Sequence, residues 1–147
     1  MMDLLELAIG ETSVGIEAGR VLEVAGRVHL EPLGSAPVHV AGLLTYRGAA
    51  IAAVDLRQRL GHASKVPSCD DQLVIVRTSR ERTVALLVDR VLGLRTGASV
   101  GPSPVRAEHI AGVVVLDDGL LLLDDIDTVL SLDDERCIDA AISGEAR

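Results

Sequence analysis

Two stretches of the chain, seventy residues apart, share one pattern of apolar and polar residues. Residues 40–61 read VAGLLTYRGAAIAAVDLRQRLG, and residues 110–131 read IAGVVVLDDGLLLLDDIDTVLS. Each has an apolar residue, Ala-Gly, a short apolar run, a polar turn, a second apolar run, and then an Asp with a Leu five residues after it. The turns differ, because the first is Arg47-Gly48 and the second is Asp117-Asp118-Gly119. We interpret the chain as two copies of one small unit, whose unequal turns favour a binding surface over a catalytic pocket.

The same offset aligns residues outside these stretches. It places Val14 on Val84, Arg20-Val21-Leu22 on Arg90-Val91-Leu92, Pro32 on Pro102 and His39 on His109. The alternative is coincidence between two Leu- and Val-rich hairpins, since such a composition produces chance matches. A solenoid is disfavoured, because solenoid units run to roughly 20–50 residues.

The composition predicts one compact body with an aliphatic core. The chain has 147 residues, of which 48% are hydrophobic, yet it has no Phe or Trp and Tyr46 is its single aromatic residue. Branched aliphatic side chains suit buried strands. The net charge of -8 argues against a nucleic-acid binder, which needs clustered Lys and Arg, and disfavours docking on anionic lipid.

Several other classes of protein find no support. The longest apolar run, Ile110 to Leu116, is far shorter than the roughly 20 residues that span a bilayer. The N-terminus has no basic region and no cleavage site, so we expect no signal peptide. Cys69 and Cys137 are too few and too far apart for a disulfide framework. We therefore expect a soluble protein of a reducing compartment, without direct membrane insertion.

Local patterns predict a mainly β protein of short strands. Asp55 is expected to cap a short helix over Leu56–Leu60, and either Asp124 or Asp125 a second one. Residues 18–24 have weak periodicity, and residues 97–104 are the most loop-like stretch. Alternating or continuous apolar runs predict strands over 5–9, 14–16, 42–46, 50–54, 73–76, 83–88, 110–116 and 120–123.

One longer helix is predicted at the C-terminal end. Ser131 and Asp134 have the spacing of a capping box. Ile138, Ala141 and Ile142 then share one face, which we expect to pack against a barrel. Many short strands with one covering helix are typical of barrels rather than of a parallel sheet.

No constellation in the chain predicts catalysis, a metal site or a cofactor. The four histidines and two cysteines lack metal-ligand spacing. The acidic run from Asp117 to Asp127 fails the EF-hand rule, because the fifth and sixth positions counted from Asp125 are Val129 and Leu130. Phosphate-binding and nucleophile motifs do not occur. We predict that the protein is not an enzyme.

The segment Tyr46-Arg47-Gly48 is the candidate recognition element. It combines, at a turn, two residue types that are enriched at interface hot spots. Tyr46 either faces outward or belongs to the core, and Arg47 is either solvated or paired, with Glu23 as a candidate partner. A solvent-exposed pair of this kind contributes only about 0.2–1 kcal/mol. Its value would lie in fixing the orientation of two segments.

Taken together, several motifs resemble the CheW family of chemotaxis coupling proteins. They cover nearly the whole chain, in the family's order and spacing. Thr45 stands where the family usually has Asn, and Glu6 lies in a first strand that is usually more apolar and aromatic. The motifs are Val14-Gly15-Ile16, Val21-Leu22-Glu23-Val24, Gly42 to Gly48, Val54-Asp55-Leu56-Arg57, and Ala85 to Val91.

The resemblance implies a fold and a function. The fold is a single CheW-like domain over residues 1–147, with two packed SH3-like five-stranded β-barrel lobes. We place the lobes at about 1–70 and 71–131, leaving exchange of strands between them open, and the C-terminal helix at 132–143. The implied function is a non-catalytic adaptor that couples chemoreceptors to a CheA-type histidine kinase. It would lie in the cytoplasm and be recruited to membrane-associated receptor arrays.

The same resemblance implies partner-binding residues, namely Val21, Glu23, Tyr46, Arg47 and Gly48. The groove between the lobes would receive the helices of the cytoplasmic receptor tip. The regulatory domain of the kinase would contact an exposed barrel end. The alternative function is a ligand-sensing β-barrel module that binds a small metabolite between the two lobes.

Overall fold

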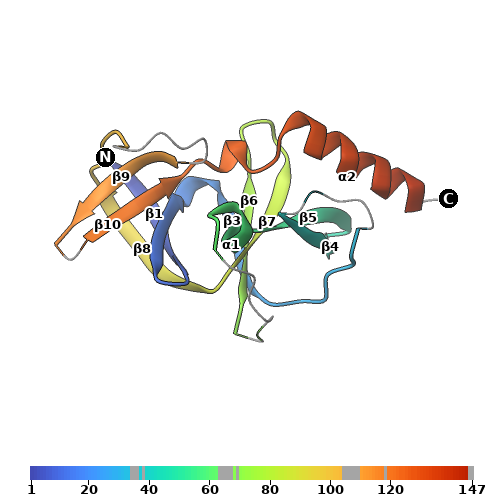
Figure 1. Cartoon of the computed structure of the whole chain (residues 1–147), viewed down its shortest axis with the longest axis horizontal. Helices are drawn as coiled ribbons and strands as arrows, with labels where there is room; N and C mark the ends of the chain where they lie inside the picture. The colour runs from blue at the N-terminus through green and yellow to red at the C-terminus, as the bar shows by residue number, and fades with distance from the viewer. Residues whose placement is uncertain are drawn as a thin grey trace.

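Two five-stranded sheets make up most of the molecule. The computed structural model describes residues 1–33, 37, 39–62, 68, 70–103, 110–117 and 119–145. The strand order is β3-β6-β7-β5-β4 in the first sheet, here called lobe 1, and β8-β1-β2-β10-β9 in the second, lobe 2. The two lobes lie side by side along the long axis (Figure 1). The predicted fold class, mainly β with two five-stranded lobes and a C-terminal helix, is confirmed.

Most elements lie where the sequence predicts them. The elements are β1 (Met2–Ile9), β2 (Thr12–Glu17), η1 (Ala18–Arg20), β3 (Val21–Gly26), β4 (Val40–Tyr46), β5 (Ala49–Asp55), α1 (Leu56–Arg59), β6 (Gln72–Arg77), β7 (Thr83–Val88), β8 (Arg90–Ala98), β9 (Ile110–Leu116), β10 (Gly119–Asp124), η2 (Ile126–Thr128) and α2 (Leu132–Glu145).

Each sheet closes on itself through one pair of backbone hydrogen bonds. In lobe 1, Glu31 and Leu43 exchange N–H···O bonds of 2.8 Å in both directions. In lobe 2, Gly101 and Val113 do the same at 2.8 and 3.0 Å. The two bridges are themselves related by the offset of 70 residues (31 + 70 = 101 and 43 + 70 = 113). Each lobe is therefore a small barrel, and the two are closed in the same way.

The lobes are interleaved rather than consecutive along the chain. The β1–β2 hairpin lies between β8 and β10 in lobe 2, and the β6–β7 hairpin lies between β3 and β5 in lobe 1. The boundary between the sheets therefore does not fall near residue 70. Each half of the chain instead places one hairpin in the sheet formed mostly by the other half.

The 70-residue offset also relates the strands of the two lobes. Adding five to each strand number, and continuing from β10 to β1, converts the order β3-β6-β7-β5-β4 into β8-β1-β2-β10-β9. The parallel pairings match in register, since Ala53 lies opposite Ala85 in lobe 1 and Leu123 lies opposite Gly15 in lobe 2. The repeat seen in the sequence is thus a repeat of architecture.

The core is aliphatic, as the composition predicts, and it joins the lobes. Its largest cluster combines Leu7, Ile9, Val14 and Ile16 of lobe 2 with Val74, Val76, Val84, Leu86 and Val88 of lobe 1. Two smaller clusters fill the barrels, one around Ile75 in lobe 1 and one around Leu121 in lobe 2. Burial of apolar surface on both faces of these strands stabilises the two lobes as one body.

The helix α2 follows lobe 2 in the chain but lies along lobe 1 (Figure 1). Its predicted capping box is present, because Ser131 N donates to Asp134 Oδ2 and Asp134 N donates to Ser131 Oγ, both at 3.0 Å. Ile138 is fully buried, and Ile142 packs against the main core. Ion pairs from the β6–β7 turn, such as Arg82 to Asp139 at 2.8 Å, hold the outer side. In the described residues we find no helix long and apolar enough to cross a membrane.

Two strands were missed by the sequence analysis. β3 lies in the stretch with weak periodicity, and β8 extends to Ala98, inside the stretch predicted to be a loop. Both strands expose most of their residues, so neither carries the alternation that marks a half-buried strand. Asp118 of the second turn, and residues 63–67 and 69 of the connector, lie outside the described residues.

Candidate functional site

The β4–β5 turn holds Arg47 in an unusual backbone conformation. Tyr46 and Ala49 are the last pair of the ladder, so Arg47 and Gly48 form a two-residue loop. Their φ angles are 49° and 82°, as in a type I′ turn, where both central residues need positive φ. Gly, Asn and Asp dominate such positions, and another residue there costs about 1–2 kcal/mol. Arg47 is therefore placed at this turn against its own backbone preference.

Three of the predicted site residues meet at one carboxylate oxygen. The Tyr46 hydroxyl donates to Glu23 Oε1 at 3.4 Å, and an Arg47 guanidinium nitrogen lies 3.7 Å from the same atom. The Arg47 guanidinium also lies over the Tyr46 ring, 5.3 Å from its centre, within cation–π range. The side chain of Arg47 is 75% exposed and that of Glu23 is 47% exposed. The contact therefore orients the Arg47 turn more than it stabilises the fold.

The sequence left open whether Tyr46 faces outward or belongs to the core, and the structure shows that it does both. Its ring packs, partly buried, against the barrel core of lobe 1, while its hydroxyl reaches Glu23 at the surface. Val21, in contrast, packs against the inter-lobe core. Its neighbour Leu22 is the exposed residue, at 46%.

Leu22, Tyr46 and Arg47 border an open depression at the mouth of lobe 1. Its volume is about 400 Å³. The sequence analysis missed Leu22, Arg77 and Thr83, because they belong to strands distant from Arg47 in the chain. The repeat could have pointed to Leu22, which aligns with Leu92. The lining residues are Leu22, Tyr46, Arg47, Ala49, Ile51, Arg77 and Thr83.

A buried ionic cluster fixes the other end of the same hairpin. Asp55 caps α1 as predicted, accepting a hydrogen bond from Arg57 N at 2.9 Å. The Arg57 guanidinium contacts Asp55 at 3.2 Å, Asp89 at 2.9 Å and Asp71 at 3.6 Å. Burial by itself would lower the pKa of Arg57, but the three carboxylates outweigh it and raise that pKa. Because Asp89 also accepts from Gly10 N at 2.6 Å, the cluster ties lobe 1 to the β1–β2 turn of lobe 2.

A second arginine of α1 reaches the chain beyond β10. Arg59 donates to Thr128 Oγ1 at 2.6 Å and to the Asp125 carbonyl at 3.0 Å, and contacts Asp124 at 3.3 Å. Asp125, rather than Asp124, caps the turn η2, accepting from Asp127 N. Asp124 is instead buried beside Arg59. Two arginines on a four-residue helix thus link the candidate site to the inter-lobe junction.

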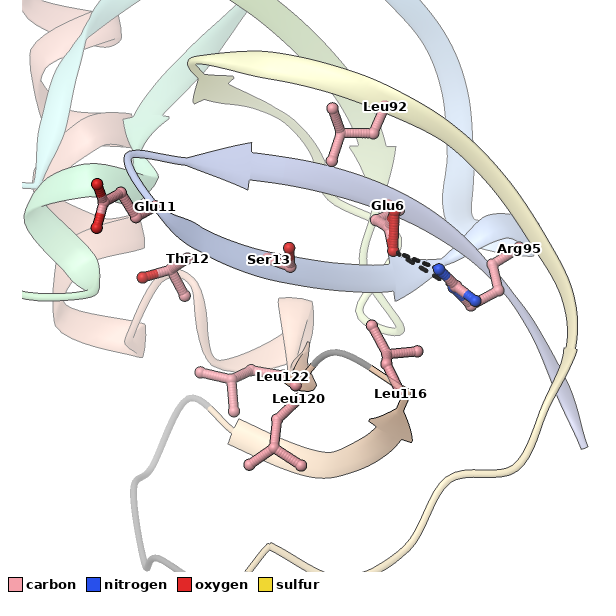
Figure 2. Close-up of a pocket in the computed structure, with 10 residues that line it drawn as sticks. Glu6, Glu11, Thr12, Ser13, Leu92, Arg95, Leu116, Leu120 and Leu122 are labelled. Carbon is pink, nitrogen blue, oxygen red and sulfur yellow. Dashed lines mark hydrogen bonds and ion pairs between the residues drawn. The ribbon is translucent and has the colours of Figure 1, made fainter.

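Lobe 2 has its own open depression, shown in Figure 2. Its volume is about 660 Å³. Inside it, Glu6 and Arg95 form an ion pair of 2.9 Å, with Leu92 on one side and Leu116, Leu120 and Leu122 on the other (Figure 2). Glu6 is the residue that departs from the apolar first strand of the family. Glu11, Thr12 and Ser13 also line this mouth, which therefore combines polar and apolar side chains.

Metal-binding chemistry has no structural support in the part of the chain that the structure describes. Among these residues, no group of three or more His, Cys, Asp or Glu side chains is placed to hold an ion. His39 contacts Asp134 of α2 at 3.2 Å.

Two interleaved barrels with a shared core define a double β-barrel protein, with a strained, exposed arginine turn as its candidate site. The chain belongs to the CheW-like domain family, whose model matches residues 3–134. The lobes are accordingly SH3-like, as the resemblance implied.

Individual relatives agree with this assignment. The chain is 28% identical over 134 residues to the chemotaxis protein CheW of Rhizobium meliloti (strain 1021), covering 86% of each protein. It is 25% identical over 144 residues to the chemotaxis protein CheW of Klebsiella aerogenes, covering 93% of this chain and 86% of that one. The crystal structure of the scaffolding protein TtCheW from Thermoanaerobacter tengcongensis matches with a TM-score of 0.81 and 21% identity, over 90% of this chain and 94% of that one. At that identity, the structural likeness concerns the fold alone.

Proposed function

We propose that the protein is a non-catalytic adaptor of a chemosensory array, which couples chemoreceptors to a CheA-type histidine kinase. Membership of the CheW-like family and similarity to two proteins named chemotaxis protein CheW support the assignment to chemotaxis. As an adaptor, the chain would act in the cytoplasm and join receptor arrays by binding to the receptor tips. The main observation in support of a role in partner recognition is the backbone conformation of Arg47.

Backbone strain at an exposed position supports a functional role for Arg47. A residue held at φ 49° costs stability that Gly or Asn would not. Arg47 is also the most exposed member of its contact with Glu23, and so recovers little energy within the fold. The side chain is therefore better explained by an interaction with a partner than by folding.

The surroundings of Arg47 fit a helix of a partner. Leu22 and Tyr46 offer apolar and aromatic surface, while Arg47 and Arg77 offer fixed positive charge beside the depression. Apolar anchors next to charges that complement an acidic side chain are typical of helix-in-groove recognition. We assign the receptor tip to this surface, at the mouth of lobe 1 rather than in the groove between the lobes where the resemblance alone would place it. Val21 supports the surface from the core, and Gly48 allows the turn.

The test is binding of the purified chain to a receptor signalling fragment and to the regulatory domain of the kinase. Titration calorimetry or a pull-down would measure both interactions in the same preparation. Binding to neither fragment would refute the adaptor role. A small metabolite that raises the melting temperature with concentration, without binding to either fragment, would favour the ligand-sensing alternative.

Two substitutions at residue 47 separate recognition from folding. Arg47→Ala is expected to weaken receptor binding about tenfold or more, as at an interface hot spot, with a melting temperature close to that of the wild type. Arg47→Gly removes the same side chain and also relieves the backbone strain, so it should bind as weakly while being at least as stable.

Arg136→Ala is the matched control, because Arg136 is an exposed arginine on α2 whose contact is with Asp133. It should bind the receptor fragment like the wild type. Gross unfolding of Arg47→Ala, or full receptor binding by Arg47→Gly, would show that the arginine serves the fold rather than the partner.

A further inference from the structure

One carboxylate from the segment after lobe 2 joins two of the strands that line the mouth of lobe 1. Asp127 belongs to η2, which follows β10 in the chain. Its carboxylate accepts a hydrogen bond from Ser79 N at 2.8 Å and two from the Arg20 guanidinium, at 3.2 and 3.5 Å. The same guanidinium donates to the Arg77 carbonyl at 3.5 Å. Because Arg20 directly precedes β3 and Ser79 lies in the β6–β7 turn, these contacts, here called the Asp127 clamp, connect the start of β3 with the end of β6.

Backbone pairing between β3 and β6 is irregular at the point where the two strands reach the mouth. Val21 lies opposite Val76, but Glu23 lies opposite Ile75, so the register shifts at Leu22. Leu22 is therefore the extra residue of a β-bulge, which has no partner in the ladder. Its place at the mouth depends on contacts outside the ladder, and the Asp127 clamp supplies such contacts at this end of β3.

Further contacts fix the position of Asp127 itself. Its backbone N donates to Asp125 Oδ1 at 3.1 Å. Arg59 of α1 donates to the Asp125 carbonyl at 3.0 Å and to the Thr128 carbonyl at 2.8 Å. α1 directly follows β5, the strand that returns from the Arg47 turn. The segment around η2 is therefore tied to all three parts of the chain that form the mouth, namely β3, the β4–β5 hairpin and the β6–β7 hairpin.

The repeat places an anchor of opposite charge at the equivalent position. The offset of 70 residues carries Arg57 onto Asp127 (57 + 70 = 127). Arg57 pairs with Asp89, whose carboxylate accepts from Gly10 N in the β1–β2 turn. Each anchor thus holds the turn of a hairpin that is exchanged between the lobes. The side chain of Arg57 is 6% exposed and that of Asp127 is 35% exposed, so the loss of Asp127 should cost much less stability.

We propose that Asp127 is a positioning residue of the recognition surface, which holds Leu22 and Arg77 in the arrangement that the partner helix meets. Leu22 and Arg77 line the depression, whereas Asp127 lies behind them on η2. Without the clamp, both strand ends gain freedom that a partner must remove on binding, and the cost of that ordering weakens the affinity. The identification of the partner as the receptor tip rests on the proposed function, but the role of Asp127 in ordering the surface does not.

Hydrogen exchange of the free chain tests the clamp without a partner. Asp127→Ala removes the hydrogen bonds that end on the carboxylate. We expect the backbone amides of residues 18–26 and 77–83 to exchange at least tenfold faster than in the wild type, because local opening becomes easier. Amides of residues 110–116 in lobe 2 should stay within twofold. Asp133→Ala, which removes an exposed acid of α2, is the matched control and should leave all three segments unchanged. Exchange at the wild-type rate in both lobe 1 segments of Asp127→Ala would overturn the proposal.

Affinity for a receptor signalling fragment, measured by titration calorimetry, tests the consequence for recognition. Asp127→Ala should bind at least fivefold more weakly than the wild type. Asp127→Asn retains an oxygen that can accept from Ser79 N but lacks the charge that holds Arg20, so its affinity should lie between the two. Gly112→Ala is the control for lost stability, since a Cβ there collides with the backbone that closes lobe 2, and it should bind the fragment like the wild type.

The outcomes separate the two proposals. Full affinity of Asp127→Ala would overturn the positioning role. An equal loss of affinity in Gly112→Ala would overturn it as well, because lost stability alone would then weaken binding. Failure of the wild type to bind the fragment would refute the adaptor role, and the exchange rates would still decide whether Asp127 orders the surface.

Discussion

At the scale of single residues, two glycines decide whether the barrels can close. A Cβ on Gly42 would lie 2.6 Å from the Glu31 carbonyl oxygen, and a Cβ on Gly112 would lie 2.7 Å from that of Gly101. Those carbonyls accept the bridging hydrogen bonds that close the two sheets. The glycine common to both copies of the repeat is therefore required because a neighbouring backbone passes too close for any side chain.

We expect Gly42→Ala and Gly112→Ala each to destabilise the protein by about 1–3 kcal/mol, as in other overpacked sites. Urea unfolding would measure the loss. Gly26→Ala is the control, since a Cβ there meets nothing within 4 Å, and it should change stability by less than about 1 kcal/mol. Equal effects at Gly26 and Gly42 would show that glycine flexibility, and not the close approach, matters.

Asp127 gives the molecule a defined response to acid. It accepts from Ser79 N at 2.8 Å and from Arg20 at 3.2 Å. Burial by itself would raise the pKa of Asp127, but the bonds from Ser79 and the charge of Arg20 outweigh it and lower that pKa below 3.8. The carboxylate therefore stabilises the fold fully above about pH 4, and this contribution disappears as the pH falls through the lowered value.

Asp127→Asn should accordingly cost about 0.2–1 kcal/mol at pH 7, because the pair with Arg20 is partly exposed. The difference from the wild type should shrink as the pH falls below about 4. Urea unfolding across pH 2–7 would follow both proteins. Asp133→Asn, at a largely exposed site on α2, should show no comparable convergence. A difference that stays constant with pH would contradict the assignment to the carboxylate charge.

At the scale of elements, α1 has importance out of proportion to its four residues. Arg57 is 5% exposed and faces Asp55, Asp71 and Asp89. Arg57→Ala would leave these acids without their shared cation, so we expect a loss of about 3–5 kcal/mol, as when one partner of a buried pair is removed. Thermal unfolding beside Arg136→Ala would measure it. A loss below about 1 kcal/mol would show that the cluster is solvated and does not hold the lobes.

The sequence predicted the elements whose side chains alternate or are buried throughout. β6 and β7 were read as buried strands because neighbouring residues on both faces are apolar. Leu73 and Val74 of β6, and Ala85 and Leu86 of β7, are all buried. β3 and β8 were not predicted because they run along exposed edges of the sheets. Leu92 and Leu94 of β8, for example, are 43% and 62% exposed. A strand without a buried face has no periodic signal to read.

The residues of the candidate site also fall into two groups, those that the sequence could predict and those that it could not. Tyr46, Arg47 and Gly48 could be found because a turn is local and its residue types are informative. Arg77 and Thr83 could not, because only the pairing of β6 and β7 between β3 and β5 brings them to the mouth that carries the β4–β5 turn. Glu23 was named as a candidate partner of Arg47 from the sequence, and the geometry places the two side chains 3.7 Å apart.

At the scale of the whole molecule, the exchange of hairpins makes each lobe depend on both halves of the chain. Lobe 1 lacks two of its three inner strands without β6 and β7, and lobe 2 lacks two of its own without β1 and β2. The main core crosses between the lobes as well, joining Leu7 and Val14 to Val74 and Leu86. No separable half carries a complete sheet or a closed core.

The chain should therefore unfold in one cooperative step, and its halves should fold only together. We expect fragments 1–62 and 68–147 each to lack stable tertiary structure, because sheet pairing and core are both interrupted by the cut. Mixed in equal amounts, they should recover the circular dichroism spectrum and a single melting transition, at a midpoint that depends on concentration as for any bimolecular assembly. Two transitions in the intact chain, or one fragment that folds alone, would contradict this, because either result requires a lobe that is continuous in sequence. Recovery on mixing would show that each half of the chain supplies a hairpin without which the other half cannot fold.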